Sequence, residues 1–197
     1  MKFGSFRSAV IALIVLLAAT PAAPLLAGTP EQQQAAFTCT DDPARVVLFV
    51  QSTKPSTGVR DTMTIYGDGR LSLARHQEGA TNRSELRLTA KELHELLRQV
   101  VDDGLAEFDP TTIRARQIDS NGGFHPKSSS GPLVKVLLSL ETLKRGERTI
   151  QPVEKAIDFM SPQLSAERFP EIREYSGLVR LLEYMEAAFQ QAGGAAP

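Results

Sequence analysis

The segment from residue 62 to residue 73 constrains the fold of this chain most, because apolar and polar residues alternate on both sides of a short turn. Alternation with a period of two is typical of β-strands that bury one face. The turn, Gly67-Asp68-Gly69, contains residue types that reach the positive φ angles of tight hairpins at little cost. The sequence therefore predicts a hairpin whose buried face carries Met63, Ile65, Leu71 and Leu73.

A helix is predicted after this hairpin, with a polar loop at 76–83 and a short strand at 85–88 between the two. Thr89 and Glu92 form a capping-box sequence, in which each side chain can bond to the other residue's backbone N–H. Apolar residues then recur at the spacing of one helix face: Leu93, Leu96, Leu97, Val100 and Val101. Gly104 is suited to end the helix in a left-handed conformation.

Three further stretches favour strands. Residues 45–51 are a short apolar run rich in β-branched residues, which predicts a central strand buried on both faces. Residues 133–141 alternate with a period of two, and after a turn at 144–147 the segment 148–153 is expected to return alongside them. Residues 156–169 show no regular pattern and are expected to be irregular.

A second helix is predicted near the end of the chain. Ser176 is its expected N-cap, and Gly193 and Gly194 are expected to end it. One face of this helix would carry Leu178, Leu181, Leu182, Met185 and Phe189. Strands in runs followed by helices indicate the α+β class. We expect an antiparallel sheet of five to six strands with two helices packed on one face, in the order hairpin, helix, hairpin, helix.

The N-terminus predicts export. Basic residues precede a wholly apolar run from Ala9 to Ala19, and small residues follow it, which is the order found in secretory signal peptides. We expect a signal peptide at residues 1–27, a flexible arm at 28–44, one α+β domain at 45–192 and a tail at 193–197. The protein would then be periplasmic or secreted. The alternative is an uncleaved membrane anchor, the only contact with a membrane that the sequence predicts.

Charge and cysteine content narrow the function classes. Without residues 1–27 the chain has 20 basic and 23 acidic residues, because Lys2 and Arg7 are removed and no acid is. This balance does not favour nucleic acid as a partner. Cys39 is the only cysteine, so no disulfide can form within the chain. The three histidines have no metal-binding spacing, and we expect neither a metal nor a cofactor.

The stretch 111–131 holds the candidate site residues. It is rich in Gly, Ser and Asn in its second half, and a structureless loop of this length in a compact domain is either functional or disordered. An apolar residue in a polar loop can anchor a partner, which makes Asn121, Phe124, His125 and Lys127 candidate binding residues. The alternative is a hydrolase that uses the 119–130 part of the loop, where Asp119, His125 and Ser128–Ser130 could supply a catalytic set.

The turn Tyr66-Gly67-Asp68-Gly69, followed by the Leu-rich helix, resembles a pattern in uncharacterised exported bacterial proteins. The order of elements is also similar to that of emfourin-type inhibitors of thermolysin-like metalloproteases. The resemblance covers residues 45–106 at the level of motifs, and it implies no particular functional residues. The long loop and the signal peptide depart from the compact emfourin type.

These observations predict a non-enzymatic exported domain that binds a protein or another ligand in the cell envelope. An inhibitor of an exported metalloprotease is the first alternative, as the resemblance implies. A hydrolase using the 119–130 loop is the second, and a purely structural envelope protein is the third. The sequence leaves the identity of the partner and the oligomeric state open.

Overall fold

The computed structural model describes residues 35–121 and 131–193. The predicted signal segment and the candidate residues Phe124, His125 and Lys127 lie outside the described residues. The described chain belongs to the α+β class, as expected, and contains these elements in order: β1 (Ala36–Thr38), β2 (Val46–Lys54), β3 (Val59–Tyr66), β4 (Arg70–Gln77), β5 (Ala80–Arg87), α1 (Ala90–Asp102), the 3-10 helix η2 (Leu105–Glu107), α2 (Pro110–Asn121), β6 (Leu133–Leu140), β7 (Thr142–Arg145), β8 (Arg148–Ile150), β9 (Val153–Met160), α3 (Pro162–Arg168) and α4 (Arg173–Gln191).

The main sheet has six antiparallel strands in the order β5-β4-β3-β2-β6-β9. Its β3–β4 pair confirms the predicted hairpin, because Met63 lies opposite Leu73 and Ile65 lies opposite Leu71, all four being buried. The turn is closed by a hydrogen bond of 3.0 Å from the Gly69 N–H to the Tyr66 carbonyl. Gly69 has a φ of +83°, the left-handed conformation that favours glycine.

Strand β2 lies in the middle of the sheet, between β3 and β6, as the apolar run predicted. The prediction that it is buried on both faces is wrong. Leu48 and Val50 are fully buried, whereas Phe49 and Gln51, which point to the opposite face, are only partly buried. Among the described residues, helices cover one face of the sheet only, so the alternate residues of β2 remain partly accessible.

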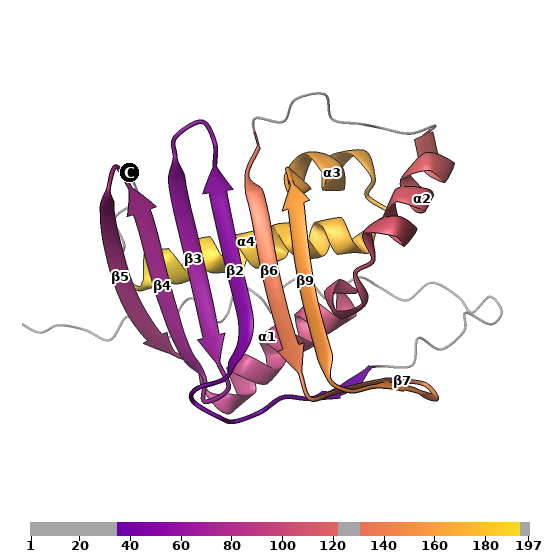
Figure 1. Ribbon diagram of the computed structural model, residues 1–197, viewed down its shortest axis with the longest axis horizontal. Coiled ribbons are helices and arrows are strands. Elements are labelled where there is room, and N and C mark those ends of the chain that lie inside the picture. The colour runs from indigo at the N-terminus through magenta and orange to yellow at the C-terminus, as the bar shows by residue number, and fades with distance from the viewer. Residues whose placement is uncertain (1–34, 122–130, 194–197) are drawn as a thin grey trace, which may run out of the picture. The chain divides into compact units, whose positions relative to one another are not determined.

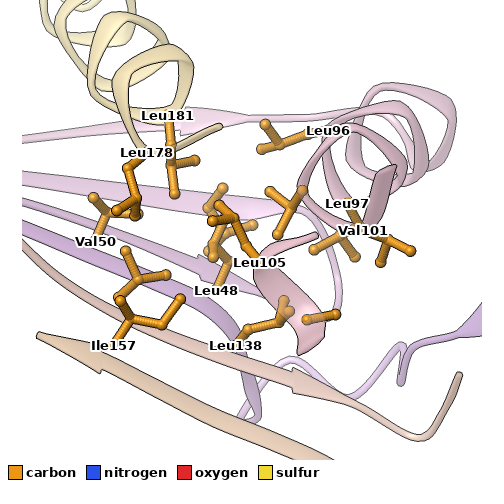
Figure 2. Packing of buried hydrophobic residues seen from close by; sticks show 14 of the residues in the cluster. Leu48, Val50, Leu96, Leu97, Val101, Leu105, Leu138, Ile157, Leu178 and Leu181 are labelled. Carbon is orange, nitrogen blue, oxygen red and sulfur yellow. The ribbon is translucent and has the colours of Figure 1, made fainter. Parts of the chain in front are cut away.

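The two predicted helices both pack on the same face of this sheet, and Figure 1 shows α1 and α4 behind the strands. In α1 both halves of the capping box form, since the Glu92 N–H donates to Thr89 Oγ1 at 3.2 Å and the Thr89 N–H donates to Glu92 Oε2 at 2.7 Å. The stripe from Leu93 to Val101 is buried as predicted. Figure 2 shows Leu178 and Leu181 of α4 among the sheet residues of this core.

Helix α2 was not expected. It occupies the first half of the stretch 111–131, where a loop was predicted. Asp109 stabilises its start by accepting hydrogen bonds from the N–H groups of Thr111 (3.1 Å) and Thr112 (3.2 Å), and Pro110 suits its first position. The prediction failed because α2 has no apolar stripe: from 110 to 117 only Ile113 is buried.

The expectation of an irregular segment at 156–169 is also wrong. Strand β9 and helix α3 occupy most of it, and β9 pairs with β6 so that Val153 and Ile157 complete the buried face. Helix α4 starts at Arg173 rather than after Ser176, and its first turn buries Tyr175. Residues 36–38 of the predicted flexible arm form β1, which pairs with β7 in a separate three-stranded sheet.

Candidate functional site

The main sheet presents one bare face in the described chain. Figure 1 shows this face turned toward the viewer, opposite α1 and α4. The residues that point to it alternate with the buried ones, and those of β5, at the edge of the sheet, are largely exposed. We call this surface the open face. An antiparallel sheet normally carries polar residues on its solvated face, so any apolar residues on the open face call for an explanation.

Four large apolar residues lie in two pairs on the half of the open face that β2, β6 and β9 form. Leu137 is 50% exposed and Met160 is 48% exposed, while Phe49 and Leu133 are partly buried. The strand register places Phe49 opposite Leu137 and Leu133 opposite Met160, and the two pairs are about 13 Å apart along β6 with Lys135 between them. We call Phe49, Leu133, Leu137 and Met160 the apolar patch. Single exposed apolar residues are normal on a protein, but a cluster of them marks a site of interaction.

A hollow of about 330 Å³ lies beside the apolar patch, at the tips of the β2–β3 and β4–β5 turns. Its lining residues are Thr53, Gly58, Arg60, His76, Gln77, Glu78, Gly79, Ala80 and Thr81. Across the strands, Thr81, His76, Arg60 and Thr53 form one row, and the same row continues into Leu133 and Met160 of the apolar patch. The hollow and the apolar patch are therefore parts of one continuous surface.

The hollow is basic at its centre. Arg60 has an exposed side chain, and a nitrogen of His76 (Nδ1) lies 2.9 Å from the Thr81 hydroxyl. Arg83 points to the same face two residues beyond Thr81 on β5. Glu78, in the β4–β5 turn, is the acidic residue among the lining side chains. Arginine, imidazole and hydroxyl groups together form a set suited to an anionic group, and Glu78 opposes it.

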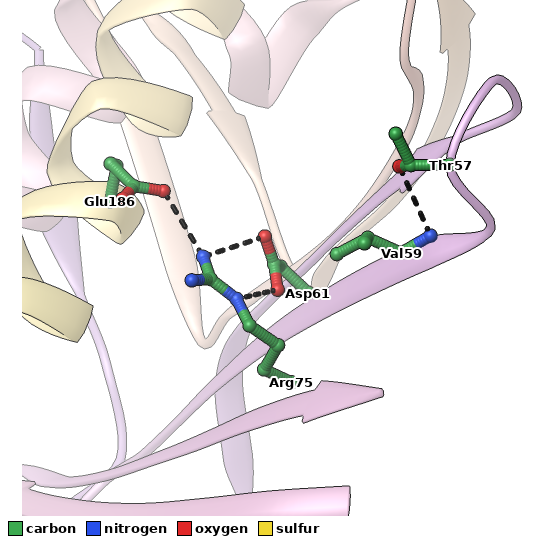
Figure 3. Close-up of polar contacts among 5 residues, drawn as sticks. All are labelled: Thr57, Val59, Asp61, Arg75 and Glu186. Atoms are coloured by element: carbon green, nitrogen blue, oxygen red, sulfur yellow. Dashed lines mark hydrogen bonds and ion pairs between the residues drawn. The ribbon is translucent and has the colours of Figure 1, made fainter. Parts of the chain in front are cut away.

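A buried ion pair fixes the strands directly beneath the hollow. Asp61 follows Arg60 on β3, and Arg75 precedes His76 on β4. Because neighbouring strand residues point to opposite faces, Asp61 and Arg75 point to the helix-covered face. Arg75 Nε lies 2.7 Å from Asp61 Oδ1, and Arg75 Nη2 lies 3.0 Å from Asp61 Oδ2. Arg75 Nη2 also lies 3.3 Å from Glu186 Oε2 of α4 (Figure 3). The hydrogen bond to Asp61 is the main cause that raises the pKa of Arg75.

This bidentate geometry holds β3, β4 and the C-terminal part of α4 together. Phe189 of α4 adds to it, because its ring centre lies 4.7 Å from the Arg75 guanidinium carbon. Figure 3 also shows the Val59 N–H donating to Thr57 Oγ1 at 3.4 Å, which closes the β2–β3 turn at the rim of the hollow. The backbone that carries Arg60 and His76 is therefore supported from below.

The residues proposed from sequence do not assemble into a described site. Asn121 is the last residue of α2, and Phe124, His125 and Lys127 fall in the segment that the structure does not describe. The binding and hydrolase roles of the 119–130 segment stay predictions. Neither Arg60 nor His76 was singled out from the sequence: His76 fell in the predicted loop 76–83, and Arg60 stands out only once the β3–β4 register places it opposite His76. The structure continues β4 to Gln77 and starts β5 at Ala80, so His76 and Thr81 are paired strand residues.

Within 35–121 and 131–193, no three His, Cys, Asp or Glu residues lie together as a metal site would require. No helix in the same ranges has the length and apolar character to cross a membrane. No family model matches the sequence, and no curated protein matches it significantly.

Proposed function

We propose that this protein is a non-enzymatic, exported binding module whose open face holds a partner protein in the cell envelope. The observation that carries the proposal is the apolar patch, in which Leu137 beside Phe49 and Met160 beside Leu133 are about half exposed on a bare sheet face. The signal-peptide pattern at residues 1–27 supports the location.

The shape of the site favours a macromolecule over a small molecule. Small-molecule sites are concave and enclose most of the ligand's surface. The hollow is open to solvent and joins a broad sheet surface, so a small ligand would stay largely exposed there. A protein partner can cover the hollow and the apolar patch together, and such a contact has the mixed composition of non-obligate interfaces, with an apolar centre and a polar rim.

Charged residues on the open face could fix the orientation of a bound partner. Lys135 pairs with Asp158 at 3.4 Å between the two apolar pairs of the patch, and Arg45 pairs with Glu154 at 3.3 Å beyond Leu137. Each ion pair joins a basic residue to an acidic residue of β9, and the two ion pairs supply polar groups next to the apolar residues. Rim charges contribute more to specificity and association rate than to affinity.

The proposal is tested by substituting one residue of the apolar patch. Leu137→Lys keeps an exposed side chain of similar length and should leave the fold intact, but it places a charge at the centre of the contact. We expect partner capture from the native envelope to fall at least tenfold, the loss typical of an interface hot spot. Leu164→Lys is the matched control, because Leu164 is 43% exposed on α3 rather than on the sheet.

Equal capture by the wild type and Leu137→Lys would refute the proposal, provided that the two variants melt at the same temperature. Association of the protein only with itself would also refute it, because the partner would then be a second copy. The emfourin-type resemblance gives the proposal a sharper alternative form, inhibition of an exported metalloprotease. A panel of purified metalloproteases tests that form, and Leu137→Lys would weaken any inhibition that uses the open face.

A further inference from the structure

We propose that the hollow receives a carboxylate of the partner protein, so that the partner presents an acidic side chain beside an apolar one. This inference depends on the proposed function, because it specifies the chemistry of the segment that the open face holds. It rests on three observations: the unpaired charge of Arg60, the arrangement of donors around it, and the distance from Arg60 to the apolar patch.

Arg60 differs from most basic residues of the open face in having no acidic partner in the described chain, and it is the arginine that lines the hollow. Lys135, Arg45 and Arg87 each form an ion pair, and the Arg70 guanidinium carbon lies 4.0 Å from the centre of the Tyr66 ring. Neither Arg60 nor Arg83 forms an ion pair with the described part of the chain. An arginine that is held on a strand and lacks an acidic partner can give both N–H groups of its planar fork to a carboxylate.

The neighbours of Arg60 place an imidazole and a hydroxyl group in the same hollow. His76 lies directly opposite Arg60 on β4, and Thr53 lies directly opposite it on β2. His76 is held by its contact with the Thr81 hydroxyl, which fixes the orientation of the ring. Glu78 lines the same hollow and repels a carboxylate, so it limits the affinity. Glu85, the other acid on this face of β5, is four residues beyond Thr81, about 13 Å along the strand.

The strand register sets the distance between the acidic and apolar groups of the partner. Arg60 is on β3 and Leu133 is on β6, with β2 between them. Neighbouring strands lie about 4.8 Å apart, so the two positions are separated by about 10 Å. A helix spans this distance between residues i and i+7, which lie on one face. A partner helix with an acidic residue and a leucine seven positions apart fits the row from Arg60 to Leu133.

The test uses the full-length protein and three synthetic helical peptides that differ at two positions only. The first peptide has Glu at position i and Leu at position i+7, the second has Gln and Leu, and the third has Glu and Ser. We expect the first to bind in a fluorescence anisotropy titration, and each of the other two to bind about tenfold more weakly. Arg60→Gln in the protein should weaken the first peptide about tenfold and leave the second unchanged. Glu78→Gln should strengthen the first peptide.

Arg148→Gln is the matched control, because Arg148 is an exposed arginine on β8 in the other sheet. Equal binding of the Glu and Gln peptides, together with loss of both in Leu133→Lys, would overturn the carboxylate site and leave the proposed function standing. Binding of no peptide to the wild type would overturn this inference too, while envelope capture that still depends on Leu137 would keep the proposed function. Binding of anionic phosphatidylglycerol vesicles alone, lost in Arg60→Gln, would assign the hollow to lipid and refute the inference.

Discussion

Asp61 and Arg75 show how a single pair of residues supports the open face from behind. The side chain of Asp61 is 3% exposed and that of Arg75 is 12% exposed, so each has lost most of its water. Transfer of charges from water is costly, and the pair is tolerated because its hydrogen bonds are bidentate and Glu186 adds a further contact. The pair matters to the site because Arg60 and His76 are its immediate neighbours in sequence.

Removal of one member of this pair should destabilise the protein strongly. Arg75→Met leaves the Asp61 carboxylate buried without its partner, and we expect the free energy of unfolding to fall by about 3–5 kcal/mol. The double variant Asp61→Asn/Arg75→Met should lose less than the single one, because no charge is then left alone. Chemical denaturation measures both values.

Lys135→Met provides the control, since Lys135 and Asp158 form a cross-strand ion pair with side chains 48% and 66% exposed. Exposed pairs contribute about 1 kcal/mol or less. If Arg75→Met and Lys135→Met lower the free energy of unfolding by the same amount, the Asp61–Arg75 pair does not support the sheet more than an exposed ion pair does.

Helix α1 shows how an element depends on its first turn. Hydrogen bonds from the Thr89 N–H and then from the Thr89 hydroxyl lower the pKa of Glu92. A lowered folded-state pKa means that the bonds stabilise the folded protein fully above the ordinary pKa of a glutamate and progressively less as the pH falls below it. The contribution of the capping box to the stability of α1 therefore decreases when the pH becomes acidic.

Glu92→Gln should remove this dependence. We expect the wild type to exceed Glu92→Gln by about 0.5 kcal/mol at pH 7, because Gln can still accept a hydrogen bond from the Thr89 N–H and only the contribution of the charge is lost. The difference should shrink as the pH falls from 5 to 3. Glu85→Gln, at an exposed position of β5, is the control and should differ little from the wild type across this range. A difference that stays constant from pH 7 to pH 3 would contradict the capping role of the Glu92 carboxylate.

The elements that the sequence predicted well are those whose own residues decide their structure. The β3–β4 hairpin and α1 combine clear periodicity with specific turn and cap residues, so local rules were enough for them. Helix α2 shows the opposite case, because Ile113 and an ion pair of 2.6 Å between Arg116 and Glu174 attach it to the rest of the fold. Such tertiary contacts leave no periodic pattern in the sequence.

The candidate site was harder to predict for a similar reason. His76 and Arg60 are 16 positions apart and look like unrelated polar residues, and only the β3–β4 register brings them together. The apolar patch also joins residues from β2, β6 and β9, which are adjacent in space but not in sequence. The outward position of Leu137 follows from the alternation of β6, yet alternation alone cannot show whether helices cover both faces.

At the scale of the whole molecule, the fold is asymmetric about its main sheet. One face is sealed by α1 and α4 over a continuous core that includes Leu48, Leu97 and Leu178, and the other face is bare in the described residues. Along each strand of the sheet, the residues that point inward form the core and the residues that point outward form the open face. A substitution on the open face can therefore change binding without changing stability.

The most direct measurement is photocrosslinking in the native envelope with a benzophenone amino acid at position 137, in the apolar patch. We expect crosslinks from position 137 to one partner protein and no such product from position 164 on α3. Loss of the product when Arg60→Gln is added would place the hollow in the same contact. Absence of any crosslink from position 137, or the same products from positions 137 and 164, would contradict the claim that the open face binds a partner.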